Sequence, residues 1–219
     1  MKLKKNCHNK SKFIVLEGIE GSGKTEMSRY LKKILKKKNI KKIISVRQPG
    51  STIISEKLRS ILKTEVKNEK IYNKTEILLF YASRIQLLKN KIFPYLKKGY
   101  WVISDRHNLS TIAYQTVYKK NNKKIIKILS NILIKNMDPD LTIYFDTLPI
   151  IGLNRISTRK NIDRIEKRSI NFFLKVRKNY IKEIKKISKK IIINASLDKE
   201  YVKKTLKKKI IFWLKKNEK

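Results

Sequence analysis

The sequence predicts an α/β fold in which one parallel sheet of five strands is flanked by helices. Five short apolar runs alternate along the chain with longer segments whose apolar residues recur at helical spacing. The runs lack polar alternation, which is typical of parallel strands buried on both faces. A glycine-rich sequence of the form G-x-x-x-x-G-K-T directly follows the first run. The 219 residues are enough for one substantial core.

The first apolar run, residues 13–17, is expected to be a strand that leads through a phosphate-binding loop into a helix at 24–38. The loop contains Gly18, Glu20, Gly21, Ser22, Gly23, Lys24 and Thr25. Glycines let backbone amides turn inward around phosphate oxygens, and the helix N-terminus adds partial positive charge. We expect Lys24 to reach the β- and γ-phosphates of a nucleoside triphosphate, and Thr25 to hold Mg²⁺ through its hydroxyl.

The rest of the chain continues the alternation of strands and helices. Strands are expected at 42–46, 100–104, 141–145 and 190–193, and helices at 52–63, 73–97, 110–118, 124–136, 149–157, 169–188 and 198–215. Pro94 is expected to kink the end of the longest helix. No repeat or linker interrupts the pattern, so residues 13–219 are expected to form a single domain after a basic tail at 1–12. The highly charged stretch at about 158–168 has little apolar pattern and is expected to be a lid.

The net charge of +39 comes from 56 Lys and Arg residues against 17 Asp and Glu residues. Such a charge first indicates nucleic acid or an anionic membrane as a partner. The lysines, however, are spread over the whole chain among many Ile and Asn residues, which is typical of a compositional bias rather than of a binding patch. We therefore expect no specific nucleic acid partner and no membrane partner, only weak binding to polyanions at low salt.

Cysteine content and apolar run length bear on location. The single cysteine, Cys7, cannot form an intrachain disulfide and suits a reducing compartment. The sequence holds no run of about 18 apolar residues, the length that a membrane-spanning helix requires. We therefore expect a cytoplasmic protein.

Arginines carry more information than lysines in this chain, because lysine cannot offer a planar, bidentate fork to a phosphate or a base edge. The ten arginines are Arg29, Arg47, Arg59, Arg84, Arg106, Arg155, Arg159, Arg164, Arg168 and Arg177. Arg47 and Arg106 follow two different strands at the carboxyl edge of the predicted sheet, where such sheets bind ligands. We expect them to converge on a second phosphate; the alternative, that each only closes its strand at the surface, stays open.

Seven motifs, in this order, resemble the bacterial form of the thymidylate kinase family over about residues 13–214. They are Gly18-Ile19-Glu20-Gly21-Ser22-Gly23-Lys24-Thr25, Arg47-Gln48-Pro49-Gly50, Phe80-Tyr81-Ala82-Ser83-Arg84, Asp105-Arg106-His107, Ser110-Thr111 with Ala113-Tyr114-Gln115, Pro139-Asp140-Leu141-Thr142, and Asp163-Arg164-Ile165-Glu166. The resemblance implies a nucleoside monophosphate kinase fold of the P-loop type and ATP-dependent phosphorylation of dTMP to dTDP. It also implies Mg²⁺ as cofactor and a homodimer.

The resemblance implies a pocket for the thymine base. Phe80 would stack on the ring as a flat apolar contact. Arg84, one helical turn further on, would donate to a thymine carbonyl. Thr111 and Gln115 would form hydrogen bonds with the base edge.

The resemblance also assigns residues to the sugar, the acceptor phosphate and the metal. Glu20 would accept a hydrogen bond from the deoxyribose 3′-OH, and Tyr114 would crowd the 2′ position. Arg47 and Arg106 would hold the dTMP phosphate. Asp105 would lie near Mg²⁺, through water.

On the donor side, the resemblance implies a catalytic cation from the lid, because the phosphate loop contains no arginine between its first and last glycine. Arg159 matches that position and would act at the transferring group together with Lys24 and Arg106. Arg155 would lie against the adenine of ATP, and Arg164 would assist at the phosphates.

The chain departs from the family pattern at three places. Gln48 stands where the family usually has Glu, and Ser51 stands where it usually has Gly. Thr116-Val117-Tyr118 replaces a usual glycine run. None of these changes removes a catalytic group, so we expect an active enzyme.

Two other functions stay open at this point. The first is another nucleotide or deoxynucleoside kinase, which would need different partners at the base edge. The second is a basic P-loop ATPase acting on nucleic acid, which would hydrolyse ATP faster when DNA or RNA is added and would bind it with a steep salt dependence.

Overall fold

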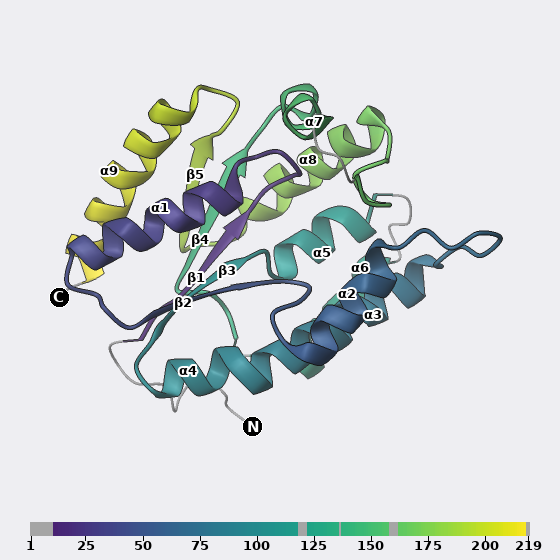
Figure 1. Ribbon diagram of the computed structural model, residues 1–219, viewed down its shortest axis with the longest axis horizontal. Helices are drawn as coiled ribbons and strands as arrows, with labels where there is room; N and C mark the ends of the chain where they lie inside the picture. Colours follow the sequence, from purple (N-terminus) through teal and green to yellow (C-terminus); the bar gives the residue numbers. More distant parts are fainter. Residues whose placement is uncertain (1–10, 118–121, 136, 158–161, 218–219) are drawn as a thin grey trace.

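The computed structural model describes residues 11–117, 122–135, 137–157 and 162–217. Within them, five parallel strands form one sheet in the order β2-β3-β1-β4-β5 (Figure 1). The strands are β1 (Phe13–Glu17), β2 (Ile43–Arg47), β3 (Trp101–Asp105), β4 (Leu141–Asp146) and β5 (Lys190–Asn194). The predicted five-stranded parallel sheet is confirmed, and each end of each strand falls within about one residue of its predicted position.

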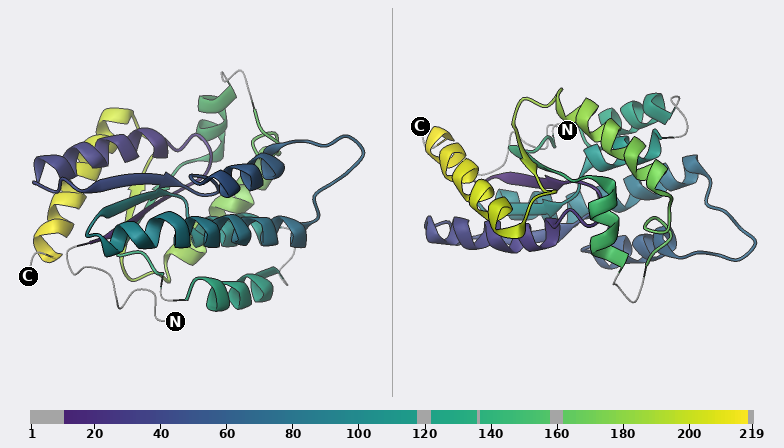
Figure 2. Two further views of the ribbon diagram at one scale, coloured as in Figure 1. Left: turned by 60° about the horizontal axis from the view of Figure 1, so that its bottom comes forward. Right: turned by 90° about the horizontal axis from the view of Figure 1, so that it is seen from above.

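Helices cover both faces of this sheet (Figures 1 and 2). They are α1 (Lys24–Lys37), α2 (Ile53–Lys63), α3 (Asn73–Leu87), α4 (Phe93–Lys97), α5 (Asn108–Gln115), α6 (Asn122–Leu133), α7 (Pro149–Ser157), α8 (Ile170–Ile184) and α9 (Lys199–Asn217). Helices α1 and α9 pack on one face, while α3, α4, α6 and α8 pack on the other. None of the described helices is both long and apolar enough to cross a membrane.

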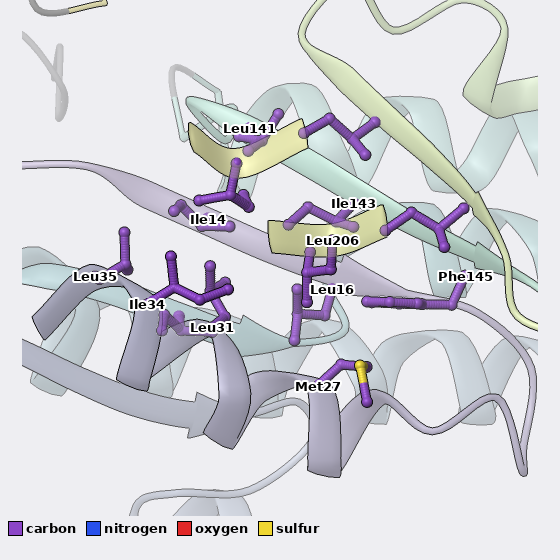
Figure 3. Packing of buried hydrophobic residues seen from close by; sticks show 14 of the residues in the cluster. Ile14, Leu16, Met27, Leu31, Ile34, Leu35, Leu141, Ile143, Phe145 and Leu206 are labelled. Atoms are coloured by element: carbon purple, nitrogen blue, oxygen red, sulfur yellow. The ribbon is translucent and has the colours of Figure 1, made fainter. Parts of the chain in front are cut away.

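The core explains why the central strands β1, β3 and β4 are continuous apolar runs, whereas burial alternates along the edge strands β2 and β5. All five residues of β1 are buried, with alternate side chains entering the two helical layers. Figure 3 shows the layer on the α1 side, where strand and helix side chains interdigitate: Ile14, Leu16, Met27, Leu31, Ile34, Leu35, Leu141, Ile143, Phe145 and Leu206. Positions 27, 31, 34 and 35 recur at helical spacing, so they form the apolar stripe that holds α1 on the sheet.

The long helix expected at 73–97 is a continuous helical stretch with an irregular middle. Helix α3 passes into a π-helical segment, η1 (Leu88–Ile92), before α4 begins. Pro94 lies in the first turn of α4. Proline has no N–H, and its ring clashes with the carbonyl four residues earlier, so the α-helical ladder cannot run through this point unchanged. The irregularity before Pro94 is thus a π-helical segment, and the predicted kink itself stays a prediction.

The described part of the predicted lid, residues 162–168, is a turn bound to the C-terminal end of α2. Arg164 donates from Nε and Nη2 to the carbonyl of Leu62, at 3.1 and 3.0 Å. The ammonium of Lys63 lies 2.5 Å from the Asp163 carboxylate. The connection between α2 and α3, residues 64–72, extends away from the body of the molecule beside this turn (Figure 2).

Candidate active site

A cavity of about 420 Å³ opens at the carboxyl edge of the sheet, where the connections after β1, β2 and β3 meet. Among the residues that line it are most of those singled out from the sequence: Glu20, Gly21, Ser22, Gly23, Lys24, Thr25, Phe80, Arg84, Asp105, Arg106, Thr111, Tyr114, Gln115 and Arg155. Parallel sheets of this kind bind ligands at this edge. The topology therefore brings residues separated by more than a hundred positions into one site.

Lys24 is folded back onto the loop that precedes it. Its Nζ donates to the carbonyls of Gly18 and Ile19, at 3.0 and 2.7 Å, and to Ser22 Oγ at 3.0 Å. Burial, followed by the charge of Arg106, lowers the pKa of Lys24 to about 8. A bound triphosphate would restore the missing negative charge next to this ammonium.

The phosphate-binding loop rests directly against α7. A Cβ added to Gly21 would come within 2.0 Å of the carbonyl oxygen of Gly152. A Cβ added to Gly152 would come within 2.6 Å of the carbonyl oxygen of Glu20. Gly21 also has a φ of 68°, in the left-handed region that glycine adopts freely. Both glycines are therefore required for the close approach of loop and helix.

Arg106, Glu20 and Tyr114 form one cluster beside the loop. Arg106 Nη2 donates to Glu20 Oε1 at 2.8 Å, and the Tyr114 hydroxyl donates a short hydrogen bond to Glu20 Oε2. The Arg106 guanidinium lies 5.2 Å from the centre of the Tyr114 ring. The backbone of Arg106 has a φ of 71°, uncommon for a residue with a side chain, and its N–H donates to the Leu16 carbonyl at 2.8 Å. The structure thus brings three predicted acceptor-site residues together.

Arg84 is a buried guanidinium surrounded by neutral acceptors. Its Nε donates to Gln48 Oε1 at 3.0 Å, and its Nη2 donates to Thr111 Oγ1 at 2.6 Å and to the His107 carbonyl at 3.2 Å. Burial lowers the pKa of Arg84. Gln48 therefore accepts a hydrogen bond from Arg84 but supplies no negative charge. Arg84 and Thr111, which were each assigned to the base pocket from the sequence, are neighbours in the structure; their contacts with a base stay a prediction.

Gln115 and Phe80 complete this part of the cavity. Gln115 Nε2 donates to Glu76 Oε1 at 3.2 Å. Its Oε1 is buried and, within the part of the chain that the structure describes, has no hydrogen-bond partner. An unpaired buried acceptor is costly. A ligand with an N–H group in the cavity would satisfy it.

Asp105 and Thr25 supply oxygen atoms next to the loop. Both line the cavity, and Asp105 Oδ1 is buried without a hydrogen-bond partner among the described residues. Carboxylate and hydroxyl oxygens are the ligands that Mg²⁺ prefers, usually with several further ligands from water and phosphate. These two residues therefore fit the predicted magnesium site.

Arg47 was predicted to hold the second phosphate. It is not one of the described residues that line the cavity. It is the last residue of β2. Because successive side chains of a strand point to opposite faces, Arg47 is exposed where the preceding Val46 is buried. Its guanidinium is 54% exposed and lies 2.9 Å from Glu56 Oε2. The turn that follows holds Ser51 at a φ of 70°, where the family usually has Gly; Ser51 N donates to Glu56 Oε1 at 2.6 Å.

Arg59 lines the cavity and was missed from the sequence. It extends from α2, where its Nη1 donates to the Pro49 carbonyl at 2.9 Å. Burial lowers the pKa of Arg59. Arg59 lies four residues after Ser55 and three before Leu62, the two buried residues of α2, so it shares their face of the helix. The sequence alone did not show which face of α2 is buried.

The donor-side arginines have three different outcomes. Arg155 donates from Nη1 to the carbonyls of Ala195 and Gly21, at 2.8 and 3.4 Å, so it bridges the phosphate loop and the connection after β5. Arg164 donates to the Leu62 carbonyl at the end of α2. Arg159 lies outside the described residues, and its catalytic role stays a prediction.

A phosphate-binding loop and several arginines that line one cavity at the carboxyl edge of a parallel sheet define a nucleotide kinase of the P-loop class. Comparison with known proteins specifies the family. The model of the thymidylate kinase family matches residues 16–206. The chain belongs to the thymidylate kinase family, which confirms the predicted fold class and the prediction that it is a kinase.

Named relatives agree with this assignment. The chain is 51% identical to the thymidylate kinase of Buchnera aphidicola subsp. Baizongia pistaciae, over 94% of this chain and 97% of the relative. It is 50% identical to the thymidylate kinase of Buchnera aphidicola subsp. Schizaphis graminum, with the same coverage. It is 41% identical to the thymidylate kinase of Wigglesworthia glossinidia brevipalpis, over 94% of this chain and 98% of the relative.

Proposed function

We propose that the protein transfers the γ-phosphoryl group of ATP to the phosphate of dTMP, giving dTDP and ADP. The observation that carries this proposal is that one cavity contains both the phosphate-binding loop and the pocket around Arg84. Donor and acceptor can therefore be held side by side, which is most of what phosphoryl transfer requires of a protein.

The base pocket suits a pyrimidine with acceptor and donor groups on one edge. Arg84 and Thr111, 2.6 Å apart, can donate to a thymine carbonyl. The unpaired Oε1 of Gln115 can accept from the N3–H of thymine. Phe80 lines the same cavity and would stack on the ring. In this arrangement Tyr114 would stand against the 2′ position of the sugar, and Glu20 would accept from the 3′-OH.

The acceptor phosphate would lie between Arg106 and Arg59, which reach the cavity from the connection after β3 and from α2. Both are guanidinium groups, which bind phosphate oxygens in a bidentate manner. Arg59 replaces Arg47 in this role, because Arg47 is exposed and paired with Glu56. Arg106 remains as predicted.

Mg²⁺ would be held by the Thr25 hydroxyl and the Asp105 carboxylate, whose Oδ1 is otherwise unpaired among the described residues. When bound with ATP, the ion neutralises charge on the phosphates. Asp105 would take part through water, as predicted.

In the transfer step, an oxygen of the dTMP phosphate forms a bond to the γ-phosphorus, and the bond from that phosphorus to the bridging oxygen of ADP breaks. Lys24 would leave the carbonyls of Gly18 and Ile19 to hold the β- and γ-phosphates. Arg106 would keep the attacking phosphate in line. Arg159 of the lid would stabilise the transferring group, and Arg155 would contact the adenine side.

The test is an ADP-release assay with Mg·ATP against dTMP, dUMP, dCMP, dGMP and AMP, with a control that lacks an acceptor. We expect strong preference for dTMP, which Arg84→Ala should reduce far more than it reduces ATP affinity. Preference for another acceptor would overturn the base-pocket assignments. ADP release that ignores every acceptor and rises with added DNA would favour a nucleic-acid-dependent ATPase instead.

We further propose that two copies pair through the face formed by α2, α3 and α6. These helices pack against one another in that order and expose large apolar side chains to solvent: Ile53, Ile54, Ile61, Leu78, Ile128 and Ile132. Exposed apolar side chains on neighbouring helices are typical of an isologous interface. In such a pair, the same face of a second copy would cover these side chains.

The oligomeric state can be measured by sedimentation at moderate salt. Ile132→Lys should shift the protein from dimer to monomer, because Ile132 is 72% exposed on this face. Phe212→Lys is the matched control, since Phe212 is 71% exposed on α9, which packs on the other face of the sheet. A monomer at all concentrations, or equal effects of the two changes, would contradict the proposal.

We place this activity in the cytoplasm. The single cysteine, Cys7, is in keeping with a reducing compartment. Fractionation of cells that express a tagged protein would test this location.

A further inference from the structure

Glu17, the last residue of β1, is a buried carboxyl group with no role in the proposed transfer step. It is 0% exposed, and burial raises its pKa. It accepts hydrogen bonds from the His107 backbone N–H at 2.8 Å, from Ser110 Oγ at 2.5 Å and from the Tyr180 hydroxyl at 3.2 Å. Within the described residues it has no ion-pair partner within 4.0 Å. The charge of Arg106 acts on this carboxyl group, but no side-chain nitrogen of Arg106 forms an ion pair with it, so the contacts between the two groups call for an explanation.

The two hydroxyls bound to Glu17 also contact Arg106. Arg106 Nη1 lies 3.1 Å from the Tyr180 hydroxyl, 3.2 Å from Ser110 Oγ and 2.8 Å from the Gly18 carbonyl. A guanidinium can only donate, so both hydroxyls must turn a lone pair toward Arg106 and their hydrogens elsewhere. Ser110 Oγ, 2.5 Å from Glu17 Oε2, gives its hydrogen to the carboxylate, and the Tyr180 hydroxyl has Glu17 Oε2 at 3.2 Å and Ser110 Oγ at 2.7 Å as acceptors on the side away from Arg106. Glu17 and Ser110 together thus fix the direction of both hydroxyl dipoles.

We propose that Tyr180 and Ser110, oriented by Glu17, are positioning residues that hold the Arg106 guanidinium for the acceptor phosphate. The inference rests on the proposed phosphate-binding role of Arg106. Nη2 is held separately, by Glu20 at 2.8 Å, so the two ends of the guanidinium have independent anchors. Tyr180 is contributed by α8, the helix that follows the predicted lid. Tyr180, which is far from the phosphate loop in sequence, thereby orients the guanidinium of Arg106.

Tyr144 provides an internal control for Tyr180. The two rings are stacked, with 5.1 Å between their centres and 24° between their planes, and both are almost fully buried. The Tyr144 hydroxyl donates to Asp146 Oδ1 at 3.0 Å rather than contacting Arg106. Replacing either tyrosine by phenylalanine keeps the ring stack and removes one buried hydroxyl. Only the Tyr180 change removes a contact with Arg106.

The first experiment measures kcat/KM for dTMP, the KM for Mg·ATP and the melting temperature of Tyr180→Phe and Tyr144→Phe. A lost hydrogen bond to a charged group corresponds to about a tenfold effect or more, so Tyr180→Phe should lower kcat/KM for dTMP at least about tenfold. The KM for Mg·ATP should stay unchanged, and Tyr144→Phe should leave all kinetic constants unchanged. Equal kinetic losses in both variants, or none in Tyr180→Phe, would overturn the inference. Should Tyr180→Phe not fold, Ser110→Ala removes the other hydroxyl and should give the same kinetic pattern.

The second experiment combines Tyr180→Phe with Arg106→Lys. If Tyr180 acts through Arg106, the double variant should have the same kcat/KM for dTMP as Arg106→Lys alone. Independent, additive losses would overturn the inference while leaving the phosphate-binding role of Arg106 in place. Normal use of dTMP by Arg106→Lys would instead refute that proposed role, and the positioning inference with it.

Discussion

Replacing Arg59 should impair the use of dTMP far more than replacing Arg47. Arg59 is partly buried in the cavity wall, whereas the side chains of Arg47 and Glu56 are 54% and 40% exposed. A charge-assisted hydrogen bond to a phosphate contributes about 1.5–3 kcal/mol, so Arg59→Ala should raise the KM for dTMP about tenfold to a hundredfold. An exposed ion pair contributes about 0–1 kcal/mol, so Arg47→Ala should change it by less than about fivefold.

The assay is ADP release at saturating Mg·ATP with dTMP varied. Arg59→Gln is the control variant, because it keeps a polar side chain with an N–H donor on the inner face of α2 but removes the charge. If Arg59 binds phosphate, Arg59→Gln should behave like Arg59→Ala in kinetics and like the parent in thermal stability. A larger rise in KM for Arg47→Ala than for Arg59→Ala would refute this reading of the cavity.

Three further predictions concern charge. Lys24 has a pKa of about 8 in the fold against 10.5 for the free side chain, so the unfolded chain binds more protons between these values and stability rises as pH increases through this window. Relative to Lys24→Met, the parent should gain about 3 kcal/mol in unfolding free energy from pH 8 to 10.5, measured in urea; a constant difference would contradict this. Gln48→Glu places a countercharge beside buried Arg84 and should raise the melting temperature at pH 8 by about 2–4 °C. This increase should be lost in acid, because the new carboxylate is then protonated. A lower melting temperature at pH 8 would contradict the stabilising effect of the countercharge. Because the net charge is +39, the melting temperature of the parent should rise with added NaCl, and a value independent of salt would show that self-repulsion is negligible.

The parts of the fold that follow from backbone rules were predictable from the sequence. The buried strands and the phosphate loop depend on local patterns, and topology then requires the loop after β1 to face the connection after β3. Residues that belong to the quoted motifs, such as Arg84 and Thr111, also lie next to each other in the structure. These features depend on residue type and order, both of which a sequence displays.

The residues that were missed depend on the direction of single side chains. Arg47 and Arg59 are both arginines near one turn, and only the pleat of β2 and the face of α2 decide which reaches the cavity. Tyr180 gave no signal at all, because an aromatic residue within an amphipathic helix is normally core. Only the structure shows that α8 places the Tyr180 hydroxyl 3.1 Å from Arg106 Nη1.

The contact between Gly21 and Gly152 limits how this chain can change over generations. The chain is rich in lysine, isoleucine and asparagine and has only six glycines in 219 residues. Exposed positions tolerate such a composition, but a methyl group on Gly21 would meet a backbone carbonyl at 2.0 Å. No compensating change at the other position can relieve that clash, because Gly152 is already the smallest residue. The phosphate loop and α7 must therefore be inherited as a matched pair.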